Sequence, residues 1–206
     1  MGCSLVLPIE YASRMPLSSS QTDDLERILY HETTILSRLD EMARGIVDDY
    51  AGRELTVVAI LHGSIIFVAD LLRRIHLPLR VETISVSSYH GGIESSGAIT
   101  FNHQDLPDFR GQHVLLVDDI LDSGRTLAAI RERVLSECRA ESVRICVLLR
   151  KRLERAEEVR ADYVGFEIGD EFVVGYGLDY QGRYRNLPMV ATLTPEAIEK
   201  GAGSKP

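Results

Sequence analysis

The sequence of 206 residues is poor in cysteine and has no long apolar run. Its three cysteines, Cys3, Cys138 and Cys146, provide neither a paired disulfide framework nor a metal-ligand spacing, which is typical of reduced thiols in a cytoplasmic protein. No apolar stretch reaches the roughly 18 residues of a membrane span, and no basic leader precedes a long apolar stretch as in a secretory signal. We therefore expect a cytoplasmic protein with no membrane partner.

An excess of basic residues is also absent. The 31 acidic residues outnumber the 23 basic ones, which gives a formal net charge of −8. General nucleic-acid binders need basic faces, because the phosphate backbone attracts positive charge. We therefore expect no nucleic-acid partner, whereas a small phosphorylated ligand needs only a local positive site and is not excluded.

The length suits one domain with a substantial core, and no internal repeat divides it. Residues 1–22 mix serine, proline and polar residues without a period, which predicts a loosely ordered extension. Residues 196–206 predict a flexible tail. The domain itself is expected over residues 23–195.

Short apolar runs alternate with helical patterns through this domain. Ile35, Leu39, Met42 and Ile46 recur at three- and four-residue steps, which predicts an amphipathic helix that ends at Gly52. Further helices are predicted over 65–75 and 126–138, and strands over 56–61, 81–86, 98–102, 114–117 and 143–149. Such alternation predicts an α/β fold with a mostly parallel, twisted sheet that has helices on both faces.

Polar or charged segments follow directly after four of these strands. In parallel sheets, ligands bind beyond the carboxyl ends of the strands. We therefore expect these segments to converge on one rim and to form a single site. They cover residues 62–64, 87–97, 118–125 and 150–151.

The most informative run covers residues 114–127, where a short apolar strand leads into Asp118 and Asp119. A third acid, Asp122, is followed by the small-residue segment 123–126 and a helical pattern. Carboxylates accept hydrogen bonds from ribose hydroxyls, and backbone N–H groups at a helix start hold phosphate. The run therefore predicts a site for a ribose that bears a phosphate.

This run resembles the phosphoribosyl-pyrophosphate (PRPP) signature of the type I phosphoribosyltransferases. Further segments are similar to the hypoxanthine(-guanine) phosphoribosyltransferases among them, so that the resemblance covers roughly residues 25–193. It implies a type I phosphoribosyltransferase-like fold with a small hood, and an enzyme of purine salvage. The implied reaction joins PRPP to hypoxanthine and/or guanine and gives IMP or GMP and pyrophosphate. The further segments are 85–89 with 94–97, 162–168, and 172–180 with 184–187.

The resemblance gives separate roles to the residues of this run. Asp118 and Asp119 would hold the ribose hydroxyls of PRPP and the Mg²⁺ around them. Asp122 would be the acid/base residue beside the imidazole-ring nitrogen of the purine, although its position also suits an N-cap of the following helix. The residues that would wrap the 5′-phosphate are Ser123, Gly124, Arg125 and Thr126, of which Arg125 could instead face solvent.

Three residues of the chain match purine-binding positions of the family. Lys151 would donate to the six-position oxygen of the base, and because an ammonium group only donates, it would favour an oxo purine over adenine. Phe172 and Val173 would stack on and line the base. The residues alone leave two plainer interpretations open, a solvated charge run around Lys151 and ordinary core positions for Phe172 and Val173.

Pyrophosphate would bind at a second set of residues. The family usually places lysine where this chain has His62, so the backbone N–H groups of Gly63 and Ser64 would carry the binding, and the family loop implies a cis peptide at Leu61–His62. Arg185 matches a pyrophosphate-binding arginine.

Two further features of the implied site lie nearby in the family. Asp179 matches a second Mg²⁺-associated acid, although Asp179 and Arg185 could each form a surface ion pair instead. Ser88 and Tyr89 open a polar loop that would close over the reacting centre as a lid.

The implied ligands are PRPP, a purine base, a purine nucleotide, pyrophosphate and Mg²⁺, and family members are commonly homodimers or homotetramers. The sequence does not rank hypoxanthine, guanine and xanthine as the preferred base.

One alternative function is a nucleotide-binding regulator on the same fold, which the acidic balance, Asp122 and Lys151 oppose. A signalling receiver domain shares the strand and acid pair but needs about a hundred further residues, whereas 87 follow Asp119 in this 206-residue chain.

Overall fold

The computed structural model describes residues 23–88, 99–101, 107–152 and 159–202. The extension predicted over residues 1–22, and residues 203–206 of the predicted tail, lie outside the described residues. No helix of the described part is long and apolar enough to cross a membrane.

The larger of two sheets has six strands in the order β4-β3-β2-β5-β6-β7. All neighbouring pairs are parallel except β3 and β4, which are antiparallel. This confirms the predicted α/β fold with a mostly parallel sheet. The strands are β2 Leu55–Leu61, β3 Leu79–Ser88, β4 Ile99–Phe101, β5 His113–Leu121, β6 Ser142–Lys151 and β7 Tyr163–Ile168.

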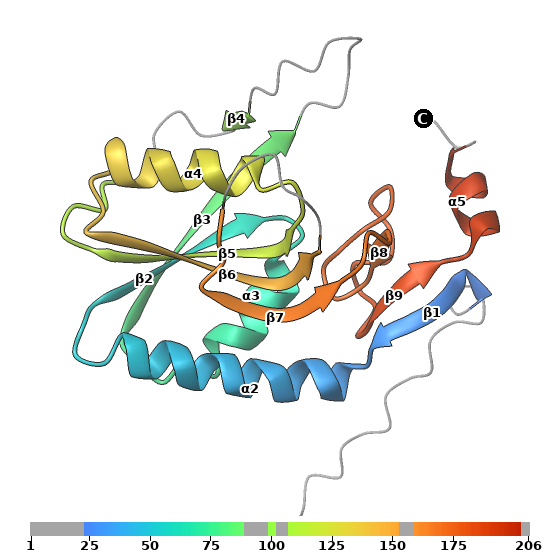
Figure 1. Cartoon of the computed structure of the whole chain (residues 1–206), viewed down its shortest axis with the longest axis horizontal. Coiled ribbons are helices and arrows are strands. Elements are labelled where there is room, and N and C mark those ends of the chain that lie inside the picture. The colour runs from blue at the N-terminus through green and yellow to red at the C-terminus, as the bar shows by residue number, and fades with distance from the viewer. Residues whose placement is uncertain (1–22, 89–98, 102–106, 153–158, 203–206) are drawn as a thin grey trace, which may run out of the picture.

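Helices cover both faces of this sheet (Figure 1), as predicted. Helices α2 (Glu32–Asp49) and α3 (Ile65–Leu72) lie on one face, and α4 (Arg125–Ser136) lies on the other. The buried side of α2 carries the predicted apolar stripe. The predicted end of this helix at Gly52 is wrong, because α2 ends at Asp49 with Tyr50 as its cap, and Gly52 lies in the turn beyond.

The second sheet forms the hood. It is antiparallel, with the order β1-β9-β8, and consists of β1 (Leu25–Tyr30), β8 (Val173–Val174) and β9 (Val190–Leu193). Figure 1 shows it beside the carboxyl ends of β6 and β7, with helix α5 (Pro195–Ala202) following β9.

Helix α5 corrects the prediction of a flexible tail for residues 196–202. Ala197 is buried at 5% exposure and packs with Leu193 in the apolar cluster of the hood. The helix has a capped start, since the amide of Ala197 donates to Oγ1 of Thr194 at 3.2 Å. Proline is favoured at the first helical position, so the sequence Thr194-Pro195 already carried this signal.

The arrangement of β2 and β5 determines where a ligand can bind. Strand β2 pairs with β3 on one side and with β5 on the other, and Ala59 lies opposite Val117. From β2 the chain continues to β3 on one side, and from β5 it continues to β6 on the other side. This reversal of strand order opens a crevice between the adjacent carboxyl ends of β2 and β5. Residues 62–64 and the run after Val117 meet at this crevice.

Candidate active site

A cavity of about 300 Å³ occupies this crevice. It brings together residues that follow β2 with residues of β5 and of the turn into α4, as the sequence predicted. A larger cavity of about 690 Å³ lies between α2 and the end of α3, but none of the predicted site residues lines it. The predicted site residues that line the smaller cavity are Gly63, Asp118, Asp119, Asp122, Ser123, Gly124 and Thr126.

Asp118 and Asp119 lie side by side near the carboxyl end of β5. Burial raises the pKa of Asp118 well above its usual range, and the neighbouring carboxylate of Asp119 raises it further. Burial also raises the pKa of Asp119, although hydrogen bonds to Asp118 and to the backbone, and then the charge of Arg185, partly offset this rise. The amides of Asp119 and Ile120 donate to the Oδ1 atoms of Asp118 and Asp119, at 3.0 and 2.8 Å. Backbone donors thus orient both carboxylates.

The acid pair fits a magnesium ion. None of the ion pairs between described residues includes Asp118 or Asp119. Two shielded carboxylates that repel each other favour a divalent cation, and an all-oxygen donor set with room for further oxygen ligands is what Mg²⁺ prefers. Asp118 and Asp119 could therefore hold Mg²⁺ together with the oxygens of a phosphorylated sugar.

The phosphate cradle lies at the start of α4. Gly124 precedes the helix with a φ of +83°, a conformation that favours glycine, and no side chain caps the helix. Asp122 is therefore not the N-cap that the alternative interpretation required. The first amides of a helix have no intrahelical partner, so those of α4 remain available to an anion. Arg125 is exposed, whereas Thr126 is half-buried beside the cavity.

The loop after β2 packs its backbone directly against the acid pair. The predicted cis peptide at Leu61–His62 is confirmed. A Cβ on Gly63 would lie 1.6 Å from Oδ2 of Asp119, so any larger residue would have to displace the carboxylate or the loop. Ser64 is fully buried and its hydroxyl donates to the carbonyl of Ile60 at 2.5 Å. The hydroxyl of Ser64 therefore has an internal partner, whereas His62 is exposed, and the pyrophosphate contacts of this loop stay a prediction.

Arg185 and Asp179 form an ion pair with each other at 2.6 Å, which is the plainer interpretation that the sequence left open. The pair nevertheless lies at the site, because Nη1 of Arg185 donates to the carbonyl of Gly177 at 2.7 Å. A Cβ on Gly177 would lie 2.1 Å from the carbonyl oxygen of Gly63. Asp179 also accepts from the amide of Gly182 at 2.7 Å, so both its oxygens have partners before any metal binds.

Lys151, at the end of β6, lies next to Asp122. Its ammonium nitrogen is 3.3 Å from Oδ2 of Asp122 and 3.2 Å from Oδ1 of Asp170, and its side chain is only 13% exposed. The interpretation of a solvated charge run is therefore wrong for Lys151. Partial burial lowers its pKa, but the hydrogen bond to Asp170 and the charge of Asp122 outweigh burial, so the net pKa is raised. Lys151 is a protonated donor at neutral pH.

Phe172 and Val173 differ in their surroundings. Phe172 is 51% exposed and meets the ring of Tyr180 edge to face at 5.5 Å, so it is not a core residue. An exposed aromatic face at the rim of a site can stack on a flat base. Val173 is 5% exposed and belongs to β8 and to the main core cluster.

Part of the predicted site lies outside the described residues. Ser88 ends β3, but its side chain and Tyr89 are not described, so their predicted lid role stays a prediction. Sequence reasoning missed Asp170, the second acid on Lys151. Nothing in the local pattern indicates this contact, which joins residues 19 positions apart.

Comparisons with known proteins agree with this geometry. Residues 27–181 match the model of the phosphoribosyl transferase domain family. The hypoxanthine-guanine phosphoribosyltransferase of Streptococcus pneumoniae is 42% identical over 174 residues, which cover 84% of this chain and 96% of the relative. That of Staphylococcus epidermidis is 43% identical over 177 residues, 86% of this chain and 98% of the relative.

Solved structures agree as well. A hypoxanthine phosphoribosyltransferase from Staphylococcus aureus superposes with a TM-score of 0.82 at 41% identity, covering 88% of this chain and 98% of that one. The enzyme of the same name from Trypanosoma cruzi gives a TM-score of 0.81 at 36% identity, with coverage of 88% and 98%.

Proposed function

Because the chain belongs to the phosphoribosyl transferase domain family, and within it to the hypoxanthine-guanine phosphoribosyltransferases, we propose that it works in purine salvage. It transfers the phosphoribosyl group of PRPP to hypoxanthine or guanine, which gives IMP or GMP and pyrophosphate. The observation that carries this proposal is the contact of Lys151 with Asp122, beside the acid pair and the phosphate cradle.

PRPP is held at three points of the crevice. Asp118 and Asp119 accept hydrogen bonds from the ribose hydroxyls, and the amides at the start of α4 bind the 5′-phosphate. The amides of Gly63 and Ser64 and the guanidinium of Arg185 bind the pyrophosphate. These groups fix the anomeric carbon between the leaving group and the base, so that positioning supplies a large part of the rate enhancement.

The purine meets a donor, an acceptor and an aromatic ring. Lys151 donates to the six-position oxygen, and Asp122 takes or holds the proton of the imidazole-ring nitrogen as the new bond forms. Oδ2 of Asp122 lies 3.3 Å from the ammonium nitrogen of Lys151, so the acid and the donor lie side by side at the site. Phe172 stacks on the base, and Val173 lines its edge.

Magnesium completes the proposed site. Mg²⁺ bound by Asp118 and Asp119, with Asp179 as a further acid, would supply the positive charge that stabilises departing pyrophosphate. Arg185 adds a fixed positive charge on the same side of the ribose. Exclusion of water from the closed site protects PRPP from hydrolysis.

The proposal extends to location and assembly. A cytoplasmic location is supported by Cys138 and Cys146, which are buried and unpaired. A homodimer or homotetramer is supported by the family resemblance alone, and light scattering after size-exclusion chromatography would test it.

The test of the proposed function is formation of IMP from PRPP and hypoxanthine, with and without Mg²⁺. We expect turnover that depends on both PRPP and Mg²⁺. Binding of IMP without any turnover in the presence of Mg²⁺ would contradict the proposal and favour the nucleotide-binding regulator, which no observation on the described residues supports at present.

A further inference from the structure

Tyr176 lies in the segment between β8 and β9 and takes no part in the proposed chemistry. Its side chain is 1% exposed, and its backbone φ is +51°, between values of +92° at Gly175 and +103° at Gly177. Residues other than glycine adopt such a conformation mainly where surrounding contacts hold them in it. The position of Tyr176 is therefore set by its contacts.

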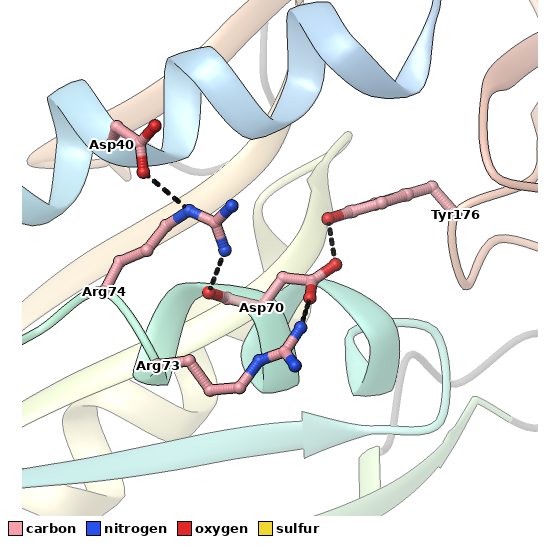
Figure 2. Close-up of polar contacts among 5 residues, drawn as sticks. All are labelled: Asp40, Asp70, Arg73, Arg74 and Tyr176. Carbon is pink, nitrogen blue, oxygen red and sulfur yellow. Dashed lines mark hydrogen bonds and ion pairs between the residues drawn. The ribbon is translucent and has the colours of Figure 1, made fainter. Parts of the chain in front are cut away.

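The side chain of Tyr176 contacts helix α3, which is in turn joined to α2 (Figure 2). The hydroxyl of Tyr176 donates to Oδ2 of Asp70 on α3 at 2.6 Å, and Asp70 also forms an ion pair with Arg73. Arg74 donates to the backbone carbonyl of Asp70 at 2.8 Å and to Oδ1 of Asp40 on α2 at 2.7 Å. Burial and the bond to Asp70 raise the pKa of Tyr176, so the phenol remains a donor at neutral pH.

The residue next to Tyr176 touches both halves of the proposed pyrophosphate site. Gly177 packs its backbone against the carbonyl oxygen of Gly63, where no Cβ would fit. It also forms two hydrogen bonds with Arg185, from its own amide to the carbonyl of Arg185 at 2.9 Å and from Nη1 of Arg185 at 2.7 Å. Asp70, which accepts the hydrogen bond from Tyr176, lies on α3, and α3 begins directly after the loop of residues 62–64.

We propose that Tyr176 and Asp70 are positioning residues for pyrophosphate. The hydrogen bond between them holds Arg185 and the loop of residues 62–64 at the separation that pyrophosphate binding needs. This inference rests on the proposed function. The purine side is held by other contacts, because Val173 is fixed by pairing with Thr192 of β9. Loss of the Tyr176 hydroxyl should therefore weaken binding of pyrophosphate and PRPP but leave purine binding unchanged.

Tyr176→Phe tests this directly, because it keeps the ring and removes the donor. We expect the KM for PRPP and the Kd for magnesium pyrophosphate, measured by calorimetry, to rise about tenfold, while the KM for hypoxanthine stays within about twofold. Asp70→Ala should reproduce this result. Asp70→Asn keeps an acceptor oxygen and should restore most of the affinity for pyrophosphate.

Tyr163→Phe is the matched control. The hydroxyl of Tyr163 donates to Oδ2 of Asp49 at the same 2.6 Å and accepts from Arg144 at 2.7 Å, but Tyr163 begins β7, whereas the site lies at the carboxyl ends of the strands. This variant should lower thermal stability without changing the KM for PRPP. Unchanged pyrophosphate affinity in Tyr176→Phe, or an equal rise in the KM values for PRPP and hypoxanthine, would overturn the inference. A wild-type protein that makes no nucleotide would instead refute the proposed function. Calorimetry would still measure how loss of the Tyr176–Asp70 hydrogen bond changes the Kd for magnesium pyrophosphate.

Discussion

At the scale of single residues, the site separates two kinds of carboxylate. Asp118 and Asp119 are shielded, repel each other and take part in none of the ion pairs between described residues, so they suit a cation and ribose hydroxyls. Asp122 is exposed and paired with Lys151, so it suits proton transfer to or from the base. The surroundings of each acid, rather than its residue type, decide its role.

Asp122→Asn tests the role of the paired acid. The amide keeps the size of the side chain but does not take up a proton, so we expect kcat to fall by about 100-fold or more. Binding of PRPP, which uses other residues, should persist when measured by calorimetry. Turnover within a few-fold of the wild type would remove Asp122 from the mechanism.

Asp118→Asn tests the electrostatic cost of the acid pair. At low pH the carboxyl group is protonated in both the folded and the unfolded chain, so the variant and the wild type should have similar stability. As pH rises, the unfolded chain releases the proton first, because folding raises the pKa of Asp118, and the wild type loses stability until pH passes that raised value.

Without Mg²⁺ at pH 7, we therefore expect the asparagine variant to be the more stable, by up to about 1.4 kcal/mol for each unit by which the pKa is raised. Thermal unfolding from pH 4 to pH 8 would measure this difference. A variant less stable than the wild type at pH 8 would contradict the account of two repelling carboxylates.

At the scale of elements, the ends of β2 and β5 build the site by close backbone contact. Gly63 lies where any side chain would enter the carboxylate of Asp119. The same contact fixes the loop of residues 62–64 against the end of β5. The amides of this loop are thus placed by packing, so we expect pyrophosphate binding to depend on the backbone of Gly63 and Ser64 more than on the side chain of His62.

Gly63→Ala should therefore be damaging. Its methyl group would lie 1.6 Å from Oδ2 of Asp119 and must displace the carboxylate or the loop. We expect kcat/KM for PRPP to fall at least about tenfold. Gly45→Ala is a control in α2, where the nearest atom is 4.0 Å from the added methyl group, and it should be neutral or slightly stabilising. Equal activity in the two variants would contradict the close contact.

The elements also show how far a sequence predicts a structure. The central strands were predictable because they are buried on both faces and appear as continuous apolar runs, such as Val114–Val117. The hood strands were not, because β8 has two residues and β1 carries exposed positions at Glu26, Arg27 and Ile28. Helix α5 was predictable in part, because Thr194-Pro195 is a helix-start signal, whereas the Gly-rich end of the chain favours a tail.

At the scale of the whole molecule, the site depends on contacts between distant parts of the chain. The convergence of the acid run, the loop after β2 and Lys151 could be predicted, because parallel strands place their carboxyl ends on one rim. The hydrogen bond between Tyr176 and Asp70 joins residues 106 positions apart. No local pattern encodes such a contact, so it could be found only in the folded chain.

The central claim is that Lys151 and Asp122 together select an oxo purine for phosphoribosyl transfer. The most direct measurement is kcat/KM for hypoxanthine, guanine, xanthine and adenine at saturating PRPP and Mg²⁺. Adenine offers an amino group where Lys151 can only donate, so two donors would face each other, and a site built to hydrogen-bond one group can reject an analogue that lacks it by up to about ten-thousand-fold. We predict a kcat/KM for hypoxanthine or guanine at least about a thousand-fold above that for adenine. Comparable values for adenine and hypoxanthine would contradict the account.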